Sequence, residues 1–314
     1  MKTLFFGAGP IGSVYAHLLV QTGGDVTVLD RGARYDWLKN NGLVLVNEMT
    51  GERQSSRVDV VNELRPEDDY ELAIVSIRKN KLGPAFETLA ACPGIKTILF
   101  MGNNALGFDM YLKHLPREKL LMGFPGVGGG NIDQIVHYAD REKPKGQPRA
   151  ITIGEIDGQT RERTEAVKAL FQSAGVPVDI TPDIDGWLKY HVVLVSPLAC
   201  ALYKHGCDAA QAAKDTEAHR AMVRAVKEGG RVLRALGFRK RQPFKINLFY
   251  WLPEFIMMKG VKALLESKFA SVAFALHAQA ARDEFEEMVH EFQQLADATS
   301  VETPNVDTLR SYIG

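Results

Sequence analysis

The sequence predicts two domains: an α/β domain with a doubly wound parallel sheet over residues 1–181, and an all-helical domain over residues 182–314. At 314 residues the chain is longer than most proteins with a single hydrophobic core, so two domains are expected. In its first part, short apolar runs alternate with segments of helical periodicity, the order typical of βαβ units. After Pro182 strand patterns nearly vanish and helical periodicity dominates. The boundary is therefore expected near residue 181.

Three elements open the α/β domain: a buried strand at Leu4-Phe5-Phe6, a helix over residues 11–21 and a second strand over residues 26–29. Two short strands are then expected on either side of a turn at Thr50-Gly51. Further strands are expected to extend the sheet, and those over residues 120–124, 135–138 and 150–153 are expected to be antiparallel. A helix that stops at Gly175 and one more strand follow. These later elements are the strands 43–46, 58–61, 72–77, 97–101, 120–124, 135–138, 150–153 and 176–180, and the helix 161–174.

The second domain contains four long segments of helical spacing and no internal repeat. The predicted helices cover residues 186–203, 216–236, 259–276 and 278–298. No stretch is apolar and long enough to predict a membrane span, because Pro253 and Glu254 interrupt the most hydrophobic one.

Composition excludes some classes of partner. Lysine and arginine number 38, as do aspartate and glutamate, so the formal net charge is zero. Nucleic acid and anionic membranes normally require a basic face, so neither is expected as the main partner. The cysteines Cys92, Cys200 and Cys207 are few and scattered, which predicts no disulfide framework and a cytoplasmic location. The histidines show no metal-ligand spacing, so no metal site is expected.

The turn Gly7-Ala8-Gly9-Pro10-Ile11-Gly12 follows a strand and opens a helix, the context of a Rossmann-type dinucleotide site. Gly7 permits the tight turn, and Gly9 lets the backbone approach a pyrophosphate. Gly12 allows close packing of helix on strand. The pyrophosphate would meet the exposed N–H groups and the positive end of the helix dipole. Gly7, Gly9, Pro10, Ile11 and Gly12 are therefore the predicted cofactor contacts.

The end of the second strand carries conflicting signals about which nicotinamide dinucleotide binds. Asp30 stands where an acidic residue accepts the ribose hydroxyl of NAD. Arg31 follows at once and Arg34 is near, and a guanidinium suits the 2′-phosphate of NADP. NADP is predicted through Arg31, and NAD stays an alternative because of Asp30.

Several stretches along nearly the whole chain then match one family in order and spacing. They are the N-terminal glycine turn, the arginine after the second strand, the run from Phe100 to Gly107, Trp187-Leu188-Lys189, and Glu284-Phe285-Glu286 before Pro304. With them the chain resembles the ketopantoate reductases (2-dehydropantoate 2-reductases) of the 6-phosphogluconate-dehydrogenase-like superfamily. The resemblance implies reduction of ketopantoate to pantoate with NADPH, on the route to pantothenate and coenzyme A.

The resemblance also implies roles for single residues. The lysine two positions after a tryptophan is Lys189, the C-terminal acidic residue is Glu284, and the asparagine of the glycine-containing loop is Asn104. Arg78 holds the place of the family's basic residue near the cofactor, and Asn104 is expected to contact the cofactor as well. An ammonium beside a ketone stabilises the charge that hydride attack builds and can then give a proton, so Lys189 is the expected general acid. The alternative is that Lys189 and Glu284 are solvated helix charges.

The sequence departs from the family in the helix after Lys189. Val193 stands where the family has an asparagine, and Ser196 stands where another often precedes the proline. Ser196 is kept as a candidate substrate contact, and so is His277 in the helix leading to Glu284. The loop reads Asn103-Asn104-Ala105 where Asn-Gly is usual. These changes leave the identity of the substrate open.

An insertion over residues 240–266 is a further departure, rich in aromatic and apolar residues. It is predicted to form core or a homodimer contact; a lid over a bulkier, more apolar substrate and a membrane-surface patch are the alternatives. The expected function is NADPH-dependent reduction of a 2-keto acid. Two alternatives stay open: a dehydrogenase of the same fold acting on another 2-hydroxy acid or opine-type substrate, and a non-catalytic dinucleotide-binding regulator.

Overall fold

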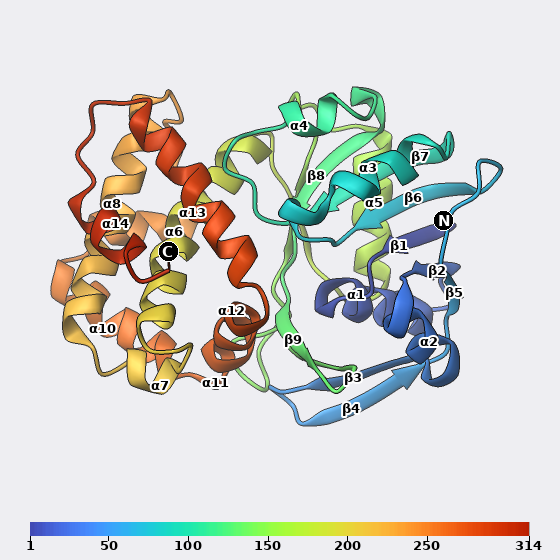
Figure 1. Ribbon diagram of the computed structural model, residues 1–314, viewed down its shortest axis with the longest axis horizontal. Coiled ribbons are helices and arrows are strands. Elements are labelled where there is room, and N and C mark those ends of the chain that lie inside the picture. Colours follow the sequence, from blue (N-terminus) through green and yellow to red (C-terminus); the bar gives the residue numbers. More distant parts are fainter. Residues whose placement is uncertain (314) are drawn as a thin grey trace. The chain divides into compact units, whose positions relative to one another are not determined.

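The computed structural model describes residues 1–313 and divides into two compact units (Figure 1). The α/β unit comprises residues 1–102 and 108–184, and the helical unit begins at Asp185. The loop Asn103–Gly107 belongs by its contacts to the helical unit, although the chain has more than seventy residues of α/β unit still to follow it. The predicted fold class, an α/β domain followed by a helical one, is confirmed.

An eight-stranded sheet forms the centre of the α/β unit, in the order β12-β11-β8-β7-β6-β1-β2-β5. Its neighbours are parallel except for β8 and β11. The central strands are apolar and buried on both faces, as expected of parallel strands covered by helices. The strands are β1 (Thr3–Phe6), β2 (Val26–Leu29), β5 (Asp59–Val61), β6 (Asp69–Val75), β7 (Gly94–Met101), β8 (Leu120–Phe124), β11 (Ile151–Gly154) and β12 (Val178–Ile180).

A second, four-stranded sheet corrects part of the predicted strand order. It runs β4-β3-β10-β9, built from β3 (Leu43–Asn47), β4 (Glu52–Ser56), β9 (Gly128–Ile132) and β10 (Ile135–Ala139). The strand that pairs with β3 across the Thr50-Gly51 turn is β4, not the predicted strand 58–61. Residues 59–61 form β5, which pairs with β2 in the large sheet. The region 135–138 lies in this small sheet, and β8 is parallel to β7, not antiparallel. Polar β4 escaped prediction because its side chains face solvent.

Helix α1 (Pro10–Gln21) packs between the two sheets (Figure 1). Pro10 occupies its first turn, where a missing N–H costs nothing. Helix α5 (Glu162–Ser173) ends before Gly175, which has φ +74°, a conformation that favours glycine. The unit's other helices are α2 (Gly32–Asn41), α3 (Gly83–Ala90), α4 (Asp109–Leu112) and the 3₁₀ turns Lys79–Lys81 and Arg117–Lys119.

Helix α6 (Ile184–Lys204) runs through the helical unit among α8, α13 and α14 (Figure 1). The predicted helix over 259–276 is wrong in its second half: the helix ends before Glu266-Ser267, and a short helix and a π-helix over Ser271–Leu276 follow. The remaining helices are α7 (Ala209–Ala212), α8 (Thr216–Ala235), α9 (Leu248–Trp251), α10 (Glu254–Leu265), α11 (Lys268–Ala270), α12 (His277–Ala280), α13 (Arg282–Asp297), α14 (Pro304–Arg310) and the 3₁₀ turn Phe244–Asn247. Within residues 1–313 no helix is both long and apolar enough to cross a bilayer.

Candidate functional site

The glycine turn lies at the carboxyl edge of the large sheet, where three neighbouring parallel strands end level. Phe6 at the end of β1 is in register with Leu29 of β2 and Val75 of β6. The residues that follow these strands, Gly7, Asp30 and Ser76, therefore emerge at one edge. Ligands of open α/β sheets bind at this kind of edge.

Backbone geometry fixes the turn itself. Gly7 has φ +100°, a conformation that side chains rarely adopt. A Cβ on Gly12 would lie 2.1 Å from the Gly7 carbonyl oxygen, so only glycine lets α1 approach the turn this closely. That carbonyl accepts a hydrogen bond of 3.0 Å from the Ser76 hydroxyl. A Cβ on Gly9 would meet nothing within 4 Å, so the backbone at the start of α1 faces open space.

Asp30 holds the turn in a way that sequence reasoning missed. One carboxylate oxygen accepts the Ala8 N–H at 2.7 Å, and the other accepts the Arg31 N–H at 2.8 Å. Both bonds are charge-assisted, and the first ties the end of β2 to the middle of the glycine turn. Asp30 thus shapes the site through its backbone partners.

The basic residues beside the turn have different surroundings. Arg34 donates to the Ala8 carbonyl at 3.1 Å, to the Gln134 carbonyl at 2.5 Å and to the Ser13 hydroxyl at 3.2 Å. Burial lowers the pKa of Arg34 from its ordinary value. Arg31 is exposed, and its guanidinium has only long contacts of 3.4 Å to Asn62 and 3.3 Å to Thr88. Arg34 is therefore a structural clamp, whereas Arg31 can turn toward a ligand.

Arg78 follows β6 and immediately precedes the 3₁₀ turn Lys79–Lys81. Its side chain is half-buried. It leaves the sheet at the carboxyl edge that carries the glycine turn, because β6 pairs with β1. The structure thus places this predicted cofactor contact on the expected strand end.

Lys189 is a buried cation on α6. Its side chain is 5% exposed and forms an ion pair with Asp185, one helical turn earlier. Its Nζ lies over the Phe238 ring, 4.8 Å from the centroid. A Cβ on Gly107 would lie 3.6 Å from Lys189 Nζ and 3.6 Å from Asp185 Oδ1, so the pair rests against the loop 103–107. Such burial is rare for a solvated helix charge.

Glu284 lies in the first turn of α13, and its side chain is 9% exposed. It accepts a hydrogen bond from Asn103 Nδ2 at 3.1 Å. His277 Nε2 lies 3.4 Å from Glu284 Oε2. The predicted residues His277 and Glu284 are therefore in contact, and Asn103 joins them from the loop.

The loop 103–107 is held by a second buried carboxylate that the sequence did not reveal. Glu291, two turns after Glu284 on α13, accepts the Ala105 N–H at 3.2 Å. Ala105 itself is fully buried in the helical core. Asn104 is also buried and donates to the Gly107 carbonyl at 2.7 Å, closing its own loop. Of the two adjacent asparagines, Asn103 donates to Glu284. The role predicted for Asn104, beside the lysine, the nicotinamide or the substrate, stays a prediction.

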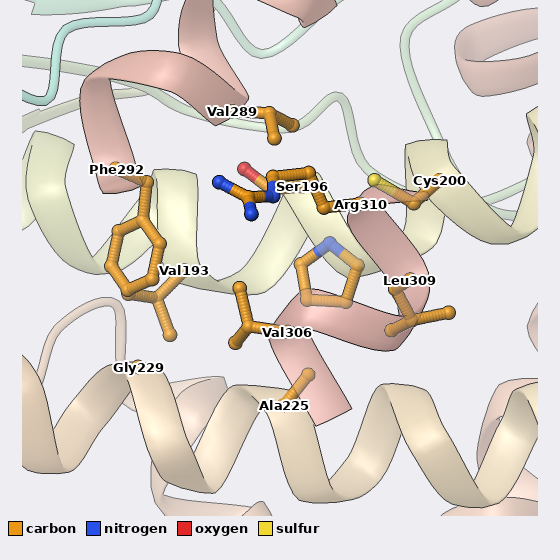
Figure 2. A pocket seen from close by; sticks show the side chains of 11 residues that line it. Val193, Ser196, Cys200, Ala225, Gly229, Val289, Phe292, Val306, Leu309 and Arg310 are labelled. Atoms are coloured by element: carbon orange, nitrogen blue, oxygen red, sulfur yellow. The ribbon is translucent and has the colours of Figure 1, made fainter. Parts of the chain in front are cut away.

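Ser196 and Val193 line a small cavity inside the helical unit, between α6, α8, α13 and α14 (Figure 2). The cavity has about 20 Å³, enough for one water molecule. Val193 packs into the core: a Cβ on Gly229 would lie 2.8 Å from its Cγ1. The Ser196 hydroxyl is buried with no hydrogen-bond partner among the described residues. The structure therefore places Ser196 beside a water-sized cavity, and its role in binding substrate stays a prediction.

Lys189 and Asp185 contact the loop 103–107 at Gly107, and Glu284 contacts it at Asn103. This helical cluster thus places an ammonium, carboxylates and an amide along one short loop, with Lys189 and Glu284 buried. Such a set can bind and protonate a developing oxyanion, because electrostatic interactions strengthen where water is excluded. Among residues 1–313 no group of three or more histidine, cysteine, aspartate or glutamate side chains is arranged to hold a metal ion.

Comparison with known proteins points in one direction. The family model described as ketopantoate reductase PanE/ApbA matches residues 3–158. A 2-dehydropantoate 2-reductase of Mesorhizobium japonicum is 24% identical over 207 residues, which cover 60% of this chain and 63% of the relative. The chain thus aligns with somewhat less than two thirds of that relative's length.

Two solved structures share the fold over nearly their whole length. The 2-dehydropantoate 2-reductase from Geobacter metallireducens GS-15 superposes with a TM-score of 0.80 at 18% identity, covering 100% of this chain and 99% of the other. A D-mandelate dehydrogenase in complex with NADH and anilino(oxo)acetate gives 0.77 at 16% identity, covering 100% and 97%. Family model, relatives and fold agree, and the chain belongs to the ketopantoate reductase family as a divergent member.

Proposed function

We propose that the chain is an NADPH-dependent oxidoreductase that reduces a 2-keto acid to a 2-hydroxy acid, with ketopantoate as the default substrate and pantothenate synthesis as its context. The observation that carries the proposal is the buried Lys189 ammonium beside Asp185 and the loop 103–107. The family match and the nearby Asn103–Glu284 hydrogen bond support it. The α/β domain, residues 1–181, would bind the dinucleotide, and the helical domain, residues 182–314, the substrate.

The residues at the carboxyl edge of the large sheet fit a dinucleotide. Gly7, Gly9 and Gly12 leave a backbone cradle: a Cβ at Gly12 would clash with the Gly7 carbonyl oxygen, and the backbone at Gly9 faces open space. Pro10 and Ile11 begin α1, whose N–H groups would receive the pyrophosphate. NADP is favoured over NAD because both Asp30 oxygens already hold backbone N–H groups, while the exposed Arg31 can meet a 2′-phosphate.

When bound, the nicotinamide supplies a hydride to the ketone carbon. As that carbon gains the hydride, its oxygen becomes an alkoxide, which the Lys189 ammonium stabilises and then protonates through Nζ. Glu284, fixed by Asn103, would accept a hydrogen bond from a substrate hydroxyl. Asn104 would act by holding the loop in its closed form, through its bond to Gly107. His277, in contact with Glu284, would orient that carboxylate.

The insertion over residues 240–266 is divided between core and surface. Phe249 and Met257 are buried, whereas Phe244 is 68% exposed and Trp251 and Phe255 are each 60% exposed. Exposed apolar patches of this kind often mark the surfaces through which proteins associate. The exposed part supports the predicted homodimer.

A second candidate function is the same chemistry on a bulkier 2-keto acid. The amide that would bind a substrate hydroxyl is replaced by Val193, which lies in the core. The Phe238 ring next to Lys189 Nζ would favour an apolar or aromatic group. The D-mandelate dehydrogenase shows that the fold accommodates an aromatic acid.

A substrate panel tests the proposal. NADPH and NADH consumption would be followed with ketopantoate, aliphatic 2-keto acids and aryl 2-keto acids. If ketopantoate is the substrate, it is turned over with NADPH. Turnover restricted to bulkier acids supports the second candidate function. Tight NADPH binding without turnover of any acid contradicts both and leaves a non-catalytic dinucleotide-binding protein.

A further inference from the structure

Asp185 is a carboxylate for which neither the family pattern nor the sequence predicted a role. It lies in the first turn of α6, four residues before Lys189, so both side chains project from the same face of the helix. Lys189 is 5% exposed and the Asp185 side chain is 30% exposed. Asp185 therefore lies between the buried ammonium and the solvent.

Two other neighbours of the Lys189 ammonium, Phe238 and Gly107, carry no charge. The Phe238 ring covers one side, and the Tyr190 hydroxyl donates to the Phe238 carbonyl at 2.7 Å, which fixes that ring's backbone. Gly107 lies on another side. On the turn of α6 after Lys189, the same face carries Val192 and Val193, which are both buried, and Val193 is packed against α8. Among these neighbours only Asp185 can direct the flexible lysine stem by charge.

We infer that Asp185 is a positioning residue, which holds the Lys189 ammonium in place against the loop 103–107. This inference rests on the proposed function, in which Lys189 stabilises and protonates the substrate alkoxide. A lysine stem has four rotatable bonds, and a displacement of about 1 Å in a reacting group can cost about a hundredfold in rate. Asp185 acts through Lys189 and does not itself touch the reacting atoms.

Three substitutions separate a charge effect from a structural one. Asp185→Asn keeps the shape but removes the charge, Asp185→Ala removes both, and Asp185→Glu restores the charge. We expect kcat to fall about 10- to 100-fold in Asp185→Asn and Asp185→Ala alike, to recover largely in Asp185→Glu, and KM to change less than about threefold. Glu217→Gln is the matched control, because Glu217 is an exposed carboxylate in the first turn of α8.

Two further measurements keep the inference open to contradiction. NADPH affinity and melting temperature are expected to stay close to wild type in Asp185→Asn, which shows that the protein is folded. A wild-type kcat in Asp185→Asn, or a loss of kcat that follows a loss of NADPH affinity, would overturn the positioning role while leaving the reductase proposal intact. If the unmodified protein turns over no 2-keto acid, the proposed function fails first.

Discussion

The two regions proposed to bind the cofactor and the substrate are built in opposite ways. At the edge of the large sheet the backbone forms the candidate site: Gly7 has φ +100°, Gly12 packs on the Gly7 carbonyl, and Gly9 faces open space. In the helical unit side chains form the candidate site, among them a lysine and two glutamates that are all buried. The first region is defined within a few consecutive residues, and the second joins segments far apart in the chain.

This difference explains why one region can be recognised locally and the other cannot. A tight turn that must approach a ligand demands glycine at fixed spacing, so the motif is visible in the sequence. A buried charge demands a partner, but the partner can come from any element. Asn103 and Glu284 illustrate this, because 181 positions separate the two ends of their hydrogen bond.

The largest effect is expected from removing the central cation of the helical cluster. Lys189→Ala should lower kcat by about 10² to 10⁴, the usual contribution of a positioned acid, with NADPH affinity unchanged. Lys204→Ala is the matched control on the same helix: Lys204 pairs with Asp215 at 2.8 Å and lies over the Tyr312 ring at 5.0 Å. Steady-state kinetics and fluorescence titration check both. Equal losses of kcat in the two variants would contradict a specific role for Lys189, because the loss would then follow from removing either ion pair on α6.

The glycine turn gives a test in which binding and stability separate. Gly9→Ala is expected to weaken NADPH binding by on the order of tenfold or more without lowering the melting temperature, since its Cβ would occupy only open space at the ligand edge. Gly83→Ala, also in open space at a helix start, should change neither. Isothermal titration and thermal unfolding measure the pair.

Gly12→Ala provides the opposite case within the same test. Its Cβ would lie 2.1 Å from the Gly7 oxygen, so both stability and binding should fall, the former by about 1–3 kcal/mol or more. If the Gly9→Ala protein binds NADPH as tightly as the wild type, the glycine turn is not part of the cofactor site.

A smaller effect is expected from the exposed arginine after β2. Arg31→Ala should reduce the preference for NADPH over NADH by about tenfold, because a guanidinium would be lost from the 2′-phosphate. Arg57→Ala is the control, an exposed arginine that donates to the Asn40 carbonyl at 2.7 Å. The ratio of kcat/KM for the two cofactors is the readout. An unchanged ratio would leave Asp30 as the residue that selects the cofactor.

The smallest effect concerns the pH dependence of the α/β unit. Burial lowers the pKa of His17 on α1, while Gln54 and Glu52 act in the opposite direction. The unfolded chain then binds more protons, so stability is fully present above about pH 6.5 and falls as the pH drops toward the lowered pKa. His17→Gln should flatten this dependence in urea midpoints measured between about pH 5.5 and 7.5. An identical slope in the variant would assign the dependence to another group.

The order of the first strands, the helical character of the second domain and the place of the glycine turn followed from periodicity and spacing. Strand pairing did not, since β4 and β5 differ in which sheet they join and polar β4 has no apolar pattern. In the site, Asp185 could have been found from a carboxylate four residues before a lysine on one helix. Asn103 and Glu291 could not, because nothing local distinguishes a buried asparagine or glutamate from a solvated one.

The most direct test of the central claim follows the hydride itself. The purified protein would be incubated with a 2-keto acid that it turns over and with NADPH deuterated at the transferable position of the nicotinamide ring. The account predicts a 2-hydroxy acid carrying one deuterium on the former ketone carbon, formed stoichiometrically with NADP. Product without the label, or NADPH bound and never oxidised with any acid of the panel, would contradict it.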